Sequence, residues 1–300
     1  MRENNVAVVI VTYNRRELLK ECLEHLENQT YKNFDVIIVD NGSTDGTEQF
    51  VDDVKAAYYR LDTNQGGAGG FNYGIKTAYK AGYQYMWIMD DDTMPKPDAL
   101  RALMDVAEVN PKFGFLASRV EWMDGKLCIM NRPVKKKPPQ EPWYTREKAV
   151  AEAEEGDVSL SKASFVSILI RRGAVKKTGL PIKEYFIWGD DMEYTQRISK
   201  HFECYYVQDS VVVHKMKSNI GSNVATDEPE RISRYIYAFR NDCCTARRNG
   251  FIPFLRYIKL VIWSIFGILI HGRDNRFKRI GAVMRGMTEG LTFNPKYEKV

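Results

Sequence analysis

The sequence is poor in cysteine and lacks the short patterns in which cysteine is usually functional. No Cys-X-X-Cys pair occurs, and the number of cysteines is odd. Disulfide frameworks and zinc ribbons both depend on paired cysteines at defined spacings, so neither is expected here. The composition is instead typical of a protein of a reducing compartment. The five cysteines are Cys22, Cys128, Cys204, Cys243 and Cys244.

Two glycine fingerprints of nucleotide-binding proteins are also missing. The sequence has neither a G-x-x-x-x-G-K-[ST] loop nor a G-x-G-x-x-G turn followed by an acidic residue at the right distance. This argues against P-loop enzymes and dinucleotide-binding folds. One glycine-rich segment, NQGGAGG, does occur at residues 64–70. Its glycines would let the backbone approach a ligand closely, or would form only a tight turn, and both interpretations stay open.

The sequence also lacks a long hydrophobic run. The apolar stretch of the tail, LVIWSIFGILI at residues 260–270, has 11 residues, whereas a helix that spans a bilayer needs about 20. We therefore expect no spanning helix. The N-terminal sequence MRENNVAVVIVTYN has a short apolar run and no small-residue cleavage site after it, so we expect a buried strand there rather than a secretory signal.

Charge is distributed unevenly along the chain. From Arg231 to the end there are 14 Lys and Arg but 4 Asp and Glu, a net charge of +10, which leaves −5 for the first 230 residues. A basic tail suggests contact with anionic lipid, nucleic acid or another polyanion, or it only keeps the protein soluble. The apolar stretch is an interfacial membrane helix, or a core or oligomer-contact helix. Its basic flank comprises Arg256, Lys259, His271, Arg273, Arg276, Lys278 and Arg279.

Four apolar segments are each followed by a helical pattern. The segments are VAVVIV (6–11), FDVIIVD (34–40), YYRLD (58–62) and YMWIMDDD (85–92). Strand then helix, repeated four times, is typical of a doubly wound α/β sheet, whose ligands bind at the carboxyl ends of its strands. The segments TYNR, DNGS, NQGG and DDD lie at those ends, so we expect all four to face one crevice.

Helices are expected at several defined places. After the glycine-rich turn we expect a helix over 71–79, and the tail should form three helices over 229–248, 253–271 and 276–291. Two further polar groups close strand-like or aromatic segments: His214 ends VVVH, and Asp190 and Asp191 follow YFIWG. These groups are the remaining candidates for chemistry.

Three adjacent aspartates are costly to hold ionised unless a cation is present. Oxygen ligands suit Mg²⁺ or Mn²⁺, so a divalent metal is the functional interpretation and a solvated acidic turn the alternative. In an extended segment Asp90 and Asp92 point the same way, toward the metal and diphosphate, and Asp91 points the opposite way, toward neighbouring protein groups. His214 is a further ligand or a structural residue.

Asp190 and Asp191 open a helix, where carboxylates are stabilised in the ionised form. Capping is therefore one interpretation. The other is a general base that deprotonates a sugar hydroxyl, with Trp188 beside it supplying apolar surroundings that keep the carboxylate basic.

Together these motifs resemble the family 2 inverting glycosyltransferases of GT-A fold. The resemblance covers about residues 6–213 and rests on VVIVTYNR, VIIVDNGSTDGT, NQGGAGGFNYG, MWIMDDDTMP and FIWGDDMEY. The GGAGGF and W-x-DD forms, with YAFRN at 237–241, are similar to the branch of bacterial galactofuranosyl- and rhamnosyltransferases. One departure is Gly189, which separates Trp188 from the aspartates and bears on the geometry of the acceptor.

The resemblance implies roles for individual residues. The metal, Mn²⁺ or Mg²⁺, would be held by Asp90, Asp92 and His214. Asp191 would be the catalytic base, and Asp190 its partner in orienting the acceptor. The residues that would bind the donor and substrate are Thr12, Tyr13, Asn14 and Arg15 at the nucleobase, Asp40 at the base or ribose, Asn64, Gly66, Gly67 and Gly70 at the donor, and Asp90, Asp91 and Trp188.

The resemblance also implies an architecture and a function. Residues 1–215 would form an α/β catalytic domain of GT-A type, with a doubly wound mixed sheet and flanking helices, and residues 216–300 a basic helical extension for membrane or oligomer contact. The enzyme would move galactofuranose from UDP-galactofuranose, or rhamnose from dTDP-rhamnose, onto a saccharide linked to polyprenyl diphosphate. It would make cell-surface polysaccharide at the inner face of the cell membrane.

Two other classes of protein compete with this interpretation. A nucleic-acid-binding protein would use the basic tail and its aromatics, but the basic residues flank an apolar helix rather than interleave with aromatics along a groove. A nucleotidyltransferase would also place aspartates and metal in an α/β crevice. It would want several basic side chains near the first strand, where only Arg15 and Arg16 are present.

Overall fold

The structure, a computed structural model, describes residues 5–51, 54–136, 159–272 and 274–300. Its internal contacts divide the chain into two compact units. The sheet unit comprises Met1–Lys183, Asp191–Asn219 and Tyr297–Val300, and the helical unit comprises Glu184–Asp190 and Ile220–Lys296. The division of the chain into domains at residue 215 stays a prediction.

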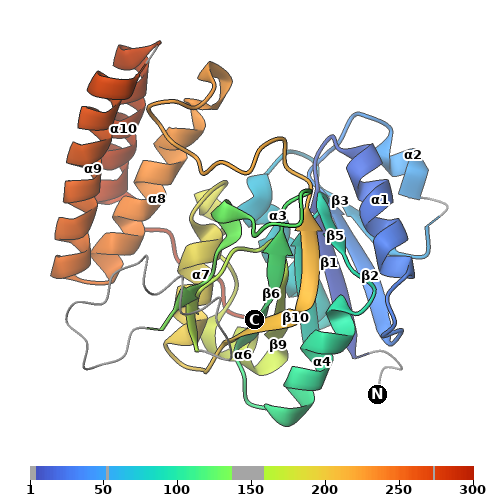
Figure 1. The fold of residues 1–300 in the computed structure, drawn as a ribbon. Helices are drawn as coiled ribbons and strands as arrows, with labels where there is room; N and C mark the ends of the chain where they lie inside the picture. Colours follow the sequence, from blue (N-terminus) through green and yellow to red (C-terminus); the bar gives the residue numbers. More distant parts are fainter. Residues whose placement is uncertain (1–4, 52–53, 137–158, 273) are drawn as a thin grey trace. The chain divides into compact units, whose positions relative to one another are not determined.

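An eight-stranded mixed sheet is the centre of the sheet unit (Figure 1). Its strand order is β3-β2-β1-β4-β9-β6-β10-β5, with β1, β2, β3 and β4 parallel and with β9 antiparallel to both of its neighbours. The strands are β1 (Val6–Thr12), β2 (Phe34–Asp40), β3 (Ala57–Arg60), β4 (Tyr85–Asp90), β5 (Thr93–Pro95), β6 (Phe115–Glu121), β9 (Ile168–Arg171) and β10 (Tyr205–His214), beside a separate pair, β7 (Val134–Lys135) and β8 (Leu160–Lys162).

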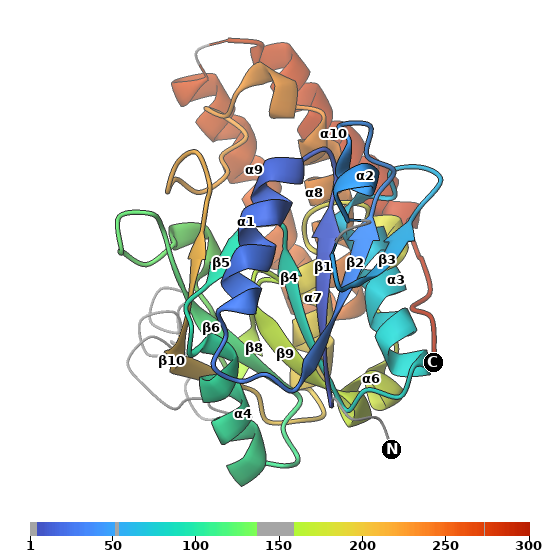
Figure 2. The same cartoon turned by 90° about the vertical axis from the view of Figure 1, so that its right-hand side faces the viewer.

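Helices cover both faces of this sheet (Figures 1 and 2). Alternate residues of β1 belong to two separate cores: Val6, Val8 and Ile10 pack with α1 and α4, whereas Ala7 and Val9 pack with α3, α6 and α7. A strand that is buried on both faces needs the continuous apolar run seen in the sequence. The helices of this unit are α1 (Arg16–Glu27), α2 (Thr47–Val51), α3 (Gly66–Lys80), α4 (Ala99–Val109), α6 (Arg172–Thr178) and α7 (Asp190–Ser199).

The register of the parallel strands aligns their polar ends. Thr12 pairs with Asp40 across β1 and β2, Val11 pairs with Asp90 across β1 and β4, and Asp40 pairs with Arg60 across β2 and β3. The segments that follow these strands therefore start at one edge of the sheet. This confirms the predicted common edge for the first, second and fourth polar segments.

The helix predicted over 71–79 is confirmed as part of α3, but the prediction that residues 66–70 form a turn before it is wrong, because these glycines belong to the helix. Helix α3 begins at Gly66. A Cβ atom on Gly70 would lie 2.4 Å from Cγ1 of Val11, and one on Gly74 would lie 2.3 Å from Cγ1 of Val9. These glycines let α3 pack directly on β1, and that packing offsets their weak helix propensity.

The helical unit contains three long helices, α8 (Arg234–Arg248), α9 (Phe251–His271) and α10 (Arg276–Thr292), after a short 3-10 turn at Pro229–Arg231. Tyr257, Val261 and Ile268 of α9 pack in the core of this unit. Within the described residues, α9 alone is long and apolar enough to cross a membrane, judged by length and composition. The apolar helix is thus longer than the 11-residue stretch suggested, because it continues through Arg256 and Lys259 over nearly the range 253–271 expected for it.

Candidate active site

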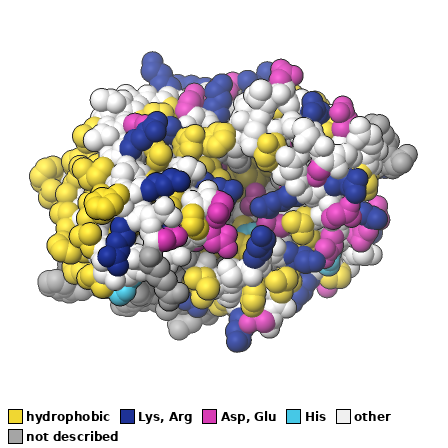
Figure 3. Space-filling view, turned by 90° about the horizontal axis from the view of Figure 1, so that it is seen from above, with side chains coloured by type: hydrophobic (Ala, Val, Ile, Leu, Met, Phe, Trp, Pro, Cys, Tyr) yellow, Lys and Arg dark blue, Asp and Glu magenta, His cyan; other side chains and the backbone are white. Residues whose placement is uncertain are grey.

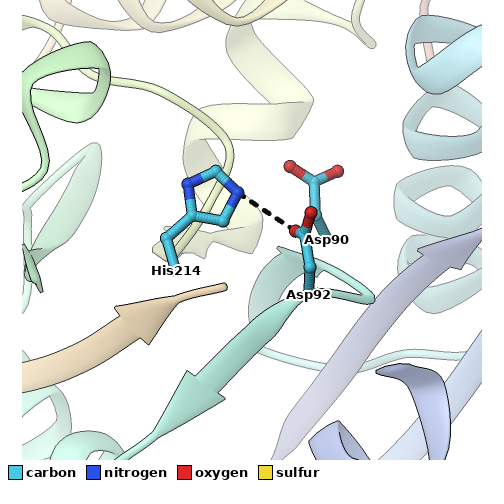
Figure 4. A group of neighbouring side chains, drawn as sticks. All are labelled: Asp90, Asp92 and His214. Carbon is cyan, nitrogen blue, oxygen red and sulfur yellow. Dashed lines mark hydrogen bonds and ion pairs between the residues drawn. The ribbon is translucent and has the colours of Figure 1, made fainter. Parts of the chain in front are cut away.

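Two carboxylates and an imidazole converge at the carboxyl edge of the sheet (Figure 4). Asp90 ends β4, Asp92 follows it, and His214 ends β10. One ligand atom from each residue lies within 4.8 Å of the others, and Nε2 of His214 is 3.1 Å from Oδ1 of Asp92. Carboxylate oxygen with imidazole nitrogen is a donor set that suits Mn²⁺ and, less strongly, Mg²⁺. The predicted grouping of these three residues is confirmed.

A second hydrogen bond fixes which nitrogen of His214 faces the cluster. Nδ1 lies 2.9 Å from Oδ1 of Asn131, while Nδ2 of Asn131 donates to Oγ of Ser164 at 2.9 Å. An amide oxygen only accepts, so Nδ1 of His214 carries a proton. The neutral ring then offers the lone pair of Nε2 to the cluster, as a metal ligand requires. The residues thus fit a divalent ion.

Burial and mutual repulsion disturb the protonation of this cluster. Burial, and next the charge of Asp92, raise the pKa of Asp90 to about 7. Burial opposes ionisation of Asp92 as well, but the hydrogen bond and charge of His214, with Arg15, outweigh it and lower the pKa of that carboxyl. For His214, burial lowers the pKa, yet the hydrogen bond with Asp92 contributes to a net rise to about 10. Without an added cation, His214 therefore holds a proton near neutral pH and Asp90 is partly protonated, whereas Asp92 is ionised.

Arg15 and Thr12 bind the remaining aspartate. Oγ1 of Thr12 donates to Oδ2 of Asp91 at 2.8 Å, and Nη1 of Arg15 lies 3.1 Å from Asp91 and 2.7 Å from Asp92. Burial raises the pKa of Asp91 to about 6, although Arg15 opposes this rise. Asp91 thus has the neighbouring side-chain partners expected of it. The structure places the guanidinium of Arg15 on these carboxylates, and its role at the nucleobase stays a prediction.

Asp40 is buried and holds the loop after β2. Its Oδ1 accepts hydrogen bonds from the backbone N and from Oγ of Ser43, at 2.8 and 2.5 Å, and its Oδ2 accepts one from the hydroxyl of Tyr58 at 2.6 Å. Burial, and then this bond to Asp40, raise the pKa of Tyr58. Through these hydrogen bonds Asp40 holds Ser43 and Tyr58 in place. Its expected hydrogen bond to the base or ribose is not tested by the structure and stays a prediction.

Asn14 and Tyr13 follow β1 beside that loop. Asn14 has a left-handed backbone, with φ of 53°, and its Oδ1 accepts a hydrogen bond from the backbone N of Thr44 at 2.8 Å. Tyr13 is 43% exposed. An exposed ring at this edge is accessible for stacking on a base.

The start of α3 supplies the other predicted donor residues. Oδ1 of Asn64 accepts a hydrogen bond from the backbone N of Gly66 at 2.7 Å, and a Cβ atom on Gly67 would meet nothing within 4 Å. The first turn of a helix presents backbone N–H groups and a positive dipole end, which suit an anion. Gly70 packs instead against Val11, so its contribution is to helix packing.

The predicted catalytic pair opens α7. The backbone N of Met192 donates to Oδ1 of Asp191 at 2.7 Å, and Asp191 is partly exposed whereas Asp190 is buried. Asp191 belongs to the sheet unit, as does the carboxylate–imidazole cluster. Trp188 and Asp190 belong to the helical unit. Gly189, which separates Trp188 from the two aspartates, has φ of +86°, a left-handed conformation that glycine adopts without strain.

Sequence reasoning missed the residues that orient the site. Asn131, Ser43 and Tyr58 hold His214 and Asp40 in place. Ser43 lies in the DNGS segment, where turn chemistry could have suggested it. No local signal marks Asn131 or Tyr58, because both reach the site only through the folded chain.

Known proteins with similar sequences are enzymes that transfer or polymerise sugars. The model of the glycosyl transferase family 2 matches residues 7–179. The galactofuranosyltransferase GlfT1 of Mycolicibacterium smegmatis is 25% identical over 297 residues, covering 90% of this chain and 91% of the relative. A poly-beta-1,6-N-acetyl-D-glucosamine synthase of Staphylococcus epidermidis is 29% identical over 113 residues, which cover 36% of this chain and 27% of the synthase.

Solved structures share the fold at low sequence identity. The mannosyltransferase PcManGT of Pyrobaculum calidifontis, in complex with GDP-Man and Mn²⁺, superposes with a TM-score of 0.57 at 15% identity, covering 97% of this chain and 88% of that one. TarS 1–349 of S. aureus, in complex with UDP, gives 0.54 at 15% identity, with 93% and 70% covered. These likenesses confirm the expected α/β fold of GT-A type.

Proposed function

The chain belongs to glycosyl transferase family 2, and from that premise we propose that it transfers galactofuranose from UDP-galactofuranose to a saccharide acceptor, with inversion at the anomeric carbon. The observation that carries the proposal is the cluster of Asp90, Asp92 and His214 at the carboxyl edge of the parallel strands. This edge is where a doubly wound sheet binds its ligand. Mn²⁺ or Mg²⁺ is the ion that these three residues would hold.

The protein's own residues have distinct tasks in the proposed reaction. Asp191 removes the proton of the acceptor hydroxyl as that oxygen attacks, and Asp190 orients the acceptor beside Trp188. Thr12, Tyr13 and Asn14 line the nucleobase, and the start of α3 borders the donor. A bound metal supplies positive charge for the diphosphate leaving group.

Nucleotide binding tests the donor. We expect UDP to bind with Mn²⁺ at least about tenfold more tightly than dTDP or GDP, because a base pocket built for one pyrimidine discriminates by about 1.4 kcal/mol or more. Isothermal titration with Mn²⁺ and with EDTA measures both base preference and metal dependence. A preference for dTDP would transfer the proposal to rhamnose from dTDP-rhamnose, and equal affinity with EDTA would contradict metal dependence.

We also propose that the helical unit docks on an anionic membrane, where a polyprenyl-diphosphate-linked acceptor would be held. Only Tyr257, Val261 and Ile268 of α9 are buried. Hydrophobic side chains gather on the surface in Figure 3, and many exposed apolar side chains on one helix indicate an interaction site. The exposed large hydrophobic residues of α9 are Phe251, Ile252, Leu255, Leu260, Ile262, Trp263, Phe266, Leu269 and Ile270.

Charge distinguishes a lipid surface from a second copy of the chain. Arg256, Lys259, Arg276 and Lys278 are exposed on α9 and at the start of α10. Between residues 251 and 288 the only acidic residue is Asp274, which is paired with Arg279. Two copies meeting through this surface would repel each other, whereas an anionic bilayer attracts it by about 1 kcal/mol per basic residue.

Vesicle binding tests this surface. We expect the protein to sediment with vesicles of 70% phosphatidylcholine and 30% phosphatidylglycerol, and the variant Trp263→Glu/Phe266→Glu to lose at least about tenfold in partitioning, because charged side chains would enter the interface. The matched control is Val109→Glu/Met123→Glu, which changes exposed apolar residues of the sheet unit. Release of the wild type by about 1 M salt indicates a peripheral helix, since salt screens surface charge. A dimer in solution that ignores vesicles would refute the proposal.

A further inference from the structure

The loop that precedes α7 has an unfavourable backbone. Phe186 and Trp188 have φ of 64° and 63°, and Gly189 has φ of 86°. The left-handed conformation is unfavourable for a residue that carries a Cβ atom, so such residues persist only where their surroundings hold them. The loop Tyr185–Gly189 lies within the helical unit, and the groups that hold it are therefore sought there.

The amide of Asn241 holds this loop. Asn241, on α8, is fully buried. Its Nδ2 lies 2.9 Å from the carbonyl oxygen of Tyr185, 3.2 Å from that of Ile187 and 2.8 Å from that of Trp188. Two N–H groups thus serve three carbonyl oxygens of one short loop. The oxygen of Tyr185 also accepts hydrogen bonds from the backbone N of Ile187 at 2.7 Å and from Nη2 of Arg240 at 3.3 Å.

The guanidinium of Arg240 fixes the orientation of that amide. Its Nε and Nη2 lie 3.1 and 3.0 Å from Oδ1 of Asn241, and Nη2 also lies 2.7 Å from the carbonyl oxygen of Glu184. A donor on one side and three acceptors on the other leave one orientation for the amide. Arg240 and Asn241 are the last two residues of the YAFRN segment, for which the transfer reaction gives no role.

Aromatic contacts attach the side chains of the loop to the same helix. The ring of Trp188 meets that of Tyr235 at 5.0 Å in an edge arrangement, and the ring of Phe186 meets that of Tyr237 at 5.0 Å. The carbonyl groups of the loop thus face Asn241 while its rings pack on Tyr235 and Tyr237. Helix α8 therefore determines the conformation of the loop.

We propose that Asn241, oriented by Arg240, is a positioning residue that sets the left-handed conformation of the Tyr185–Gly189 loop. The loop carries Trp188 and leads directly into α7, whose first residues are Asp190 and Asp191. The expected effect of Asn241 on turnover rests on the function proposed above. The expected effect of Asn241 on the conformation of Trp188 does not rest on it, and the two effects are measured separately.

The first measurement reports on Trp188 without any substrate. The full chain is labelled with 5-fluorotryptophan, and the ¹⁹F resonance of Trp188, one of five tryptophans, is assigned with Trp188→Phe. In Asn241→Asp the side chain keeps its size but presents oxygen to the three carbonyl oxygens. We expect the Trp188 resonance to shift or broaden and the other four resonances to keep their positions.

The matched control removes a buried hydrogen bond elsewhere in the helical unit. The hydroxyl of Tyr257 donates to the carbonyl oxygen of Phe239 at 3.0 Å. We expect Tyr257→Phe to lower stability by an amount typical of one such bond while leaving the Trp188 resonance unchanged. If Asn241→Asp does not fold, Arg240→Gln, which withdraws the guanidinium from Asn241 and from the carbonyl oxygens of Glu184 and Tyr185, is expected to shift the same resonance with smaller amplitude.

The second measurement is turnover. We expect Asn241→Asp to lower kcat by about 10- to 100-fold, because a displacement of about 1 Å near reacting groups has an effect of this size. Affinity for UDP and Mn²⁺ should stay within about twofold of the wild type, since the residues predicted to bind the nucleotide and the metal lie in the sheet unit. Tyr257→Phe should keep kcat.

Two results would overturn the proposal. One is an unchanged Trp188 resonance in folded Asn241→Asp and Arg240→Gln. The other is an equal change in Tyr257→Phe, which would show that loss of stability alone moves the loop. A shifted resonance with normal kcat would leave the positioning of Trp188 intact and would count against the proposed catalytic role of this loop.

Discussion

Replacing Asp191 with asparagine is expected to lower kcat by about 10³-fold while UDP still binds with Mn²⁺ as in the wild type. The amide has the size of the carboxylate but cannot take a proton, and a positioned general base contributes about 10²- to 10⁴-fold. Asp191 lies at the second position of α7, partly exposed, and its Oδ1 accepts a hydrogen bond from the backbone N of Met192. Steady-state transfer from UDP-galactofuranose and calorimetric UDP binding, on the same preparation, measure the two quantities.

Two further variants show whether the effect belongs to Asp191. Asp190→Asn is expected to raise KM for the acceptor and to lower kcat less, since Asp190 is proposed to orient rather than to accept the proton. Asp105→Asn changes an exposed aspartate of α4 and should leave both constants unchanged. A larger loss of kcat in Asp190→Asn would exchange the two roles, and a near-normal rate in Asp191→Asn would remove it as the base.

Replacing Asp92 with alanine is expected to reduce affinity for Mn²⁺ by at least about 100-fold, because loss of even an outer hydrogen-bonding partner typically costs 10- to 100-fold. Asp92 is the member of the cluster that contacts both His214 and Arg15, at 3.1 and 2.7 Å. Its removal takes away a proposed ligand and also a hydrogen-bond partner of His214. Titration of MnCl₂, and of UDP in the presence of Mn²⁺, measures the loss directly.

Asp91 provides the matched comparison for the metal site. It is adjacent in sequence, but it binds Thr12 and Arg15 and does not belong to the cluster. Asp91→Asn is therefore expected to keep affinity for Mn²⁺ within about tenfold of the wild type. If Asp92→Ala binds Mn²⁺ and UDP normally, and EDTA has no effect on either protein, the three residues are not the metal site.

Some of the site could be predicted from local sequence. Continuous apolar, β-branched runs such as VAVVIV are typical of strands buried on both faces, and the polar residues after parallel strands then lie at one edge of the sheet. Asp40 and Asp90 are opposite Thr12 and Val11 for this reason. The repulsion among three consecutive aspartates also predicted that a positive charge lies beside them. In the structure the guanidinium of Arg15 pairs with Asp91 and Asp92.

Local sequence was misleading wherever packing outweighs propensity. Glycines at residues 66–70 favour a turn, but they belong to α3, in which Gly70 and Gly74 approach Val11 and Val9 too closely for a residue with a Cβ atom. The helix predicted over 253–271 is present as α9, Phe251–His271, and only its apolar length was underestimated from the 11-residue stretch. In α3 the face that packs decides where the helix begins.

By itself the sequence determined the α/β class, the parallel strands and the polar residues at their ends, because these depend on periodicity over a few residues. Only the tertiary structure decided which polar residues meet. His214 and Asp92 are 122 positions apart, and His214 and Asn131 are 83 apart. Asn241 and Tyr185, which are hydrogen-bonded, are 56 positions apart. Such contacts follow from strand order and helix packing, which a local pattern does not encode, and the free energy of holding a buried amide or imidazole in one orientation is supplied by partners from distant parts of the chain.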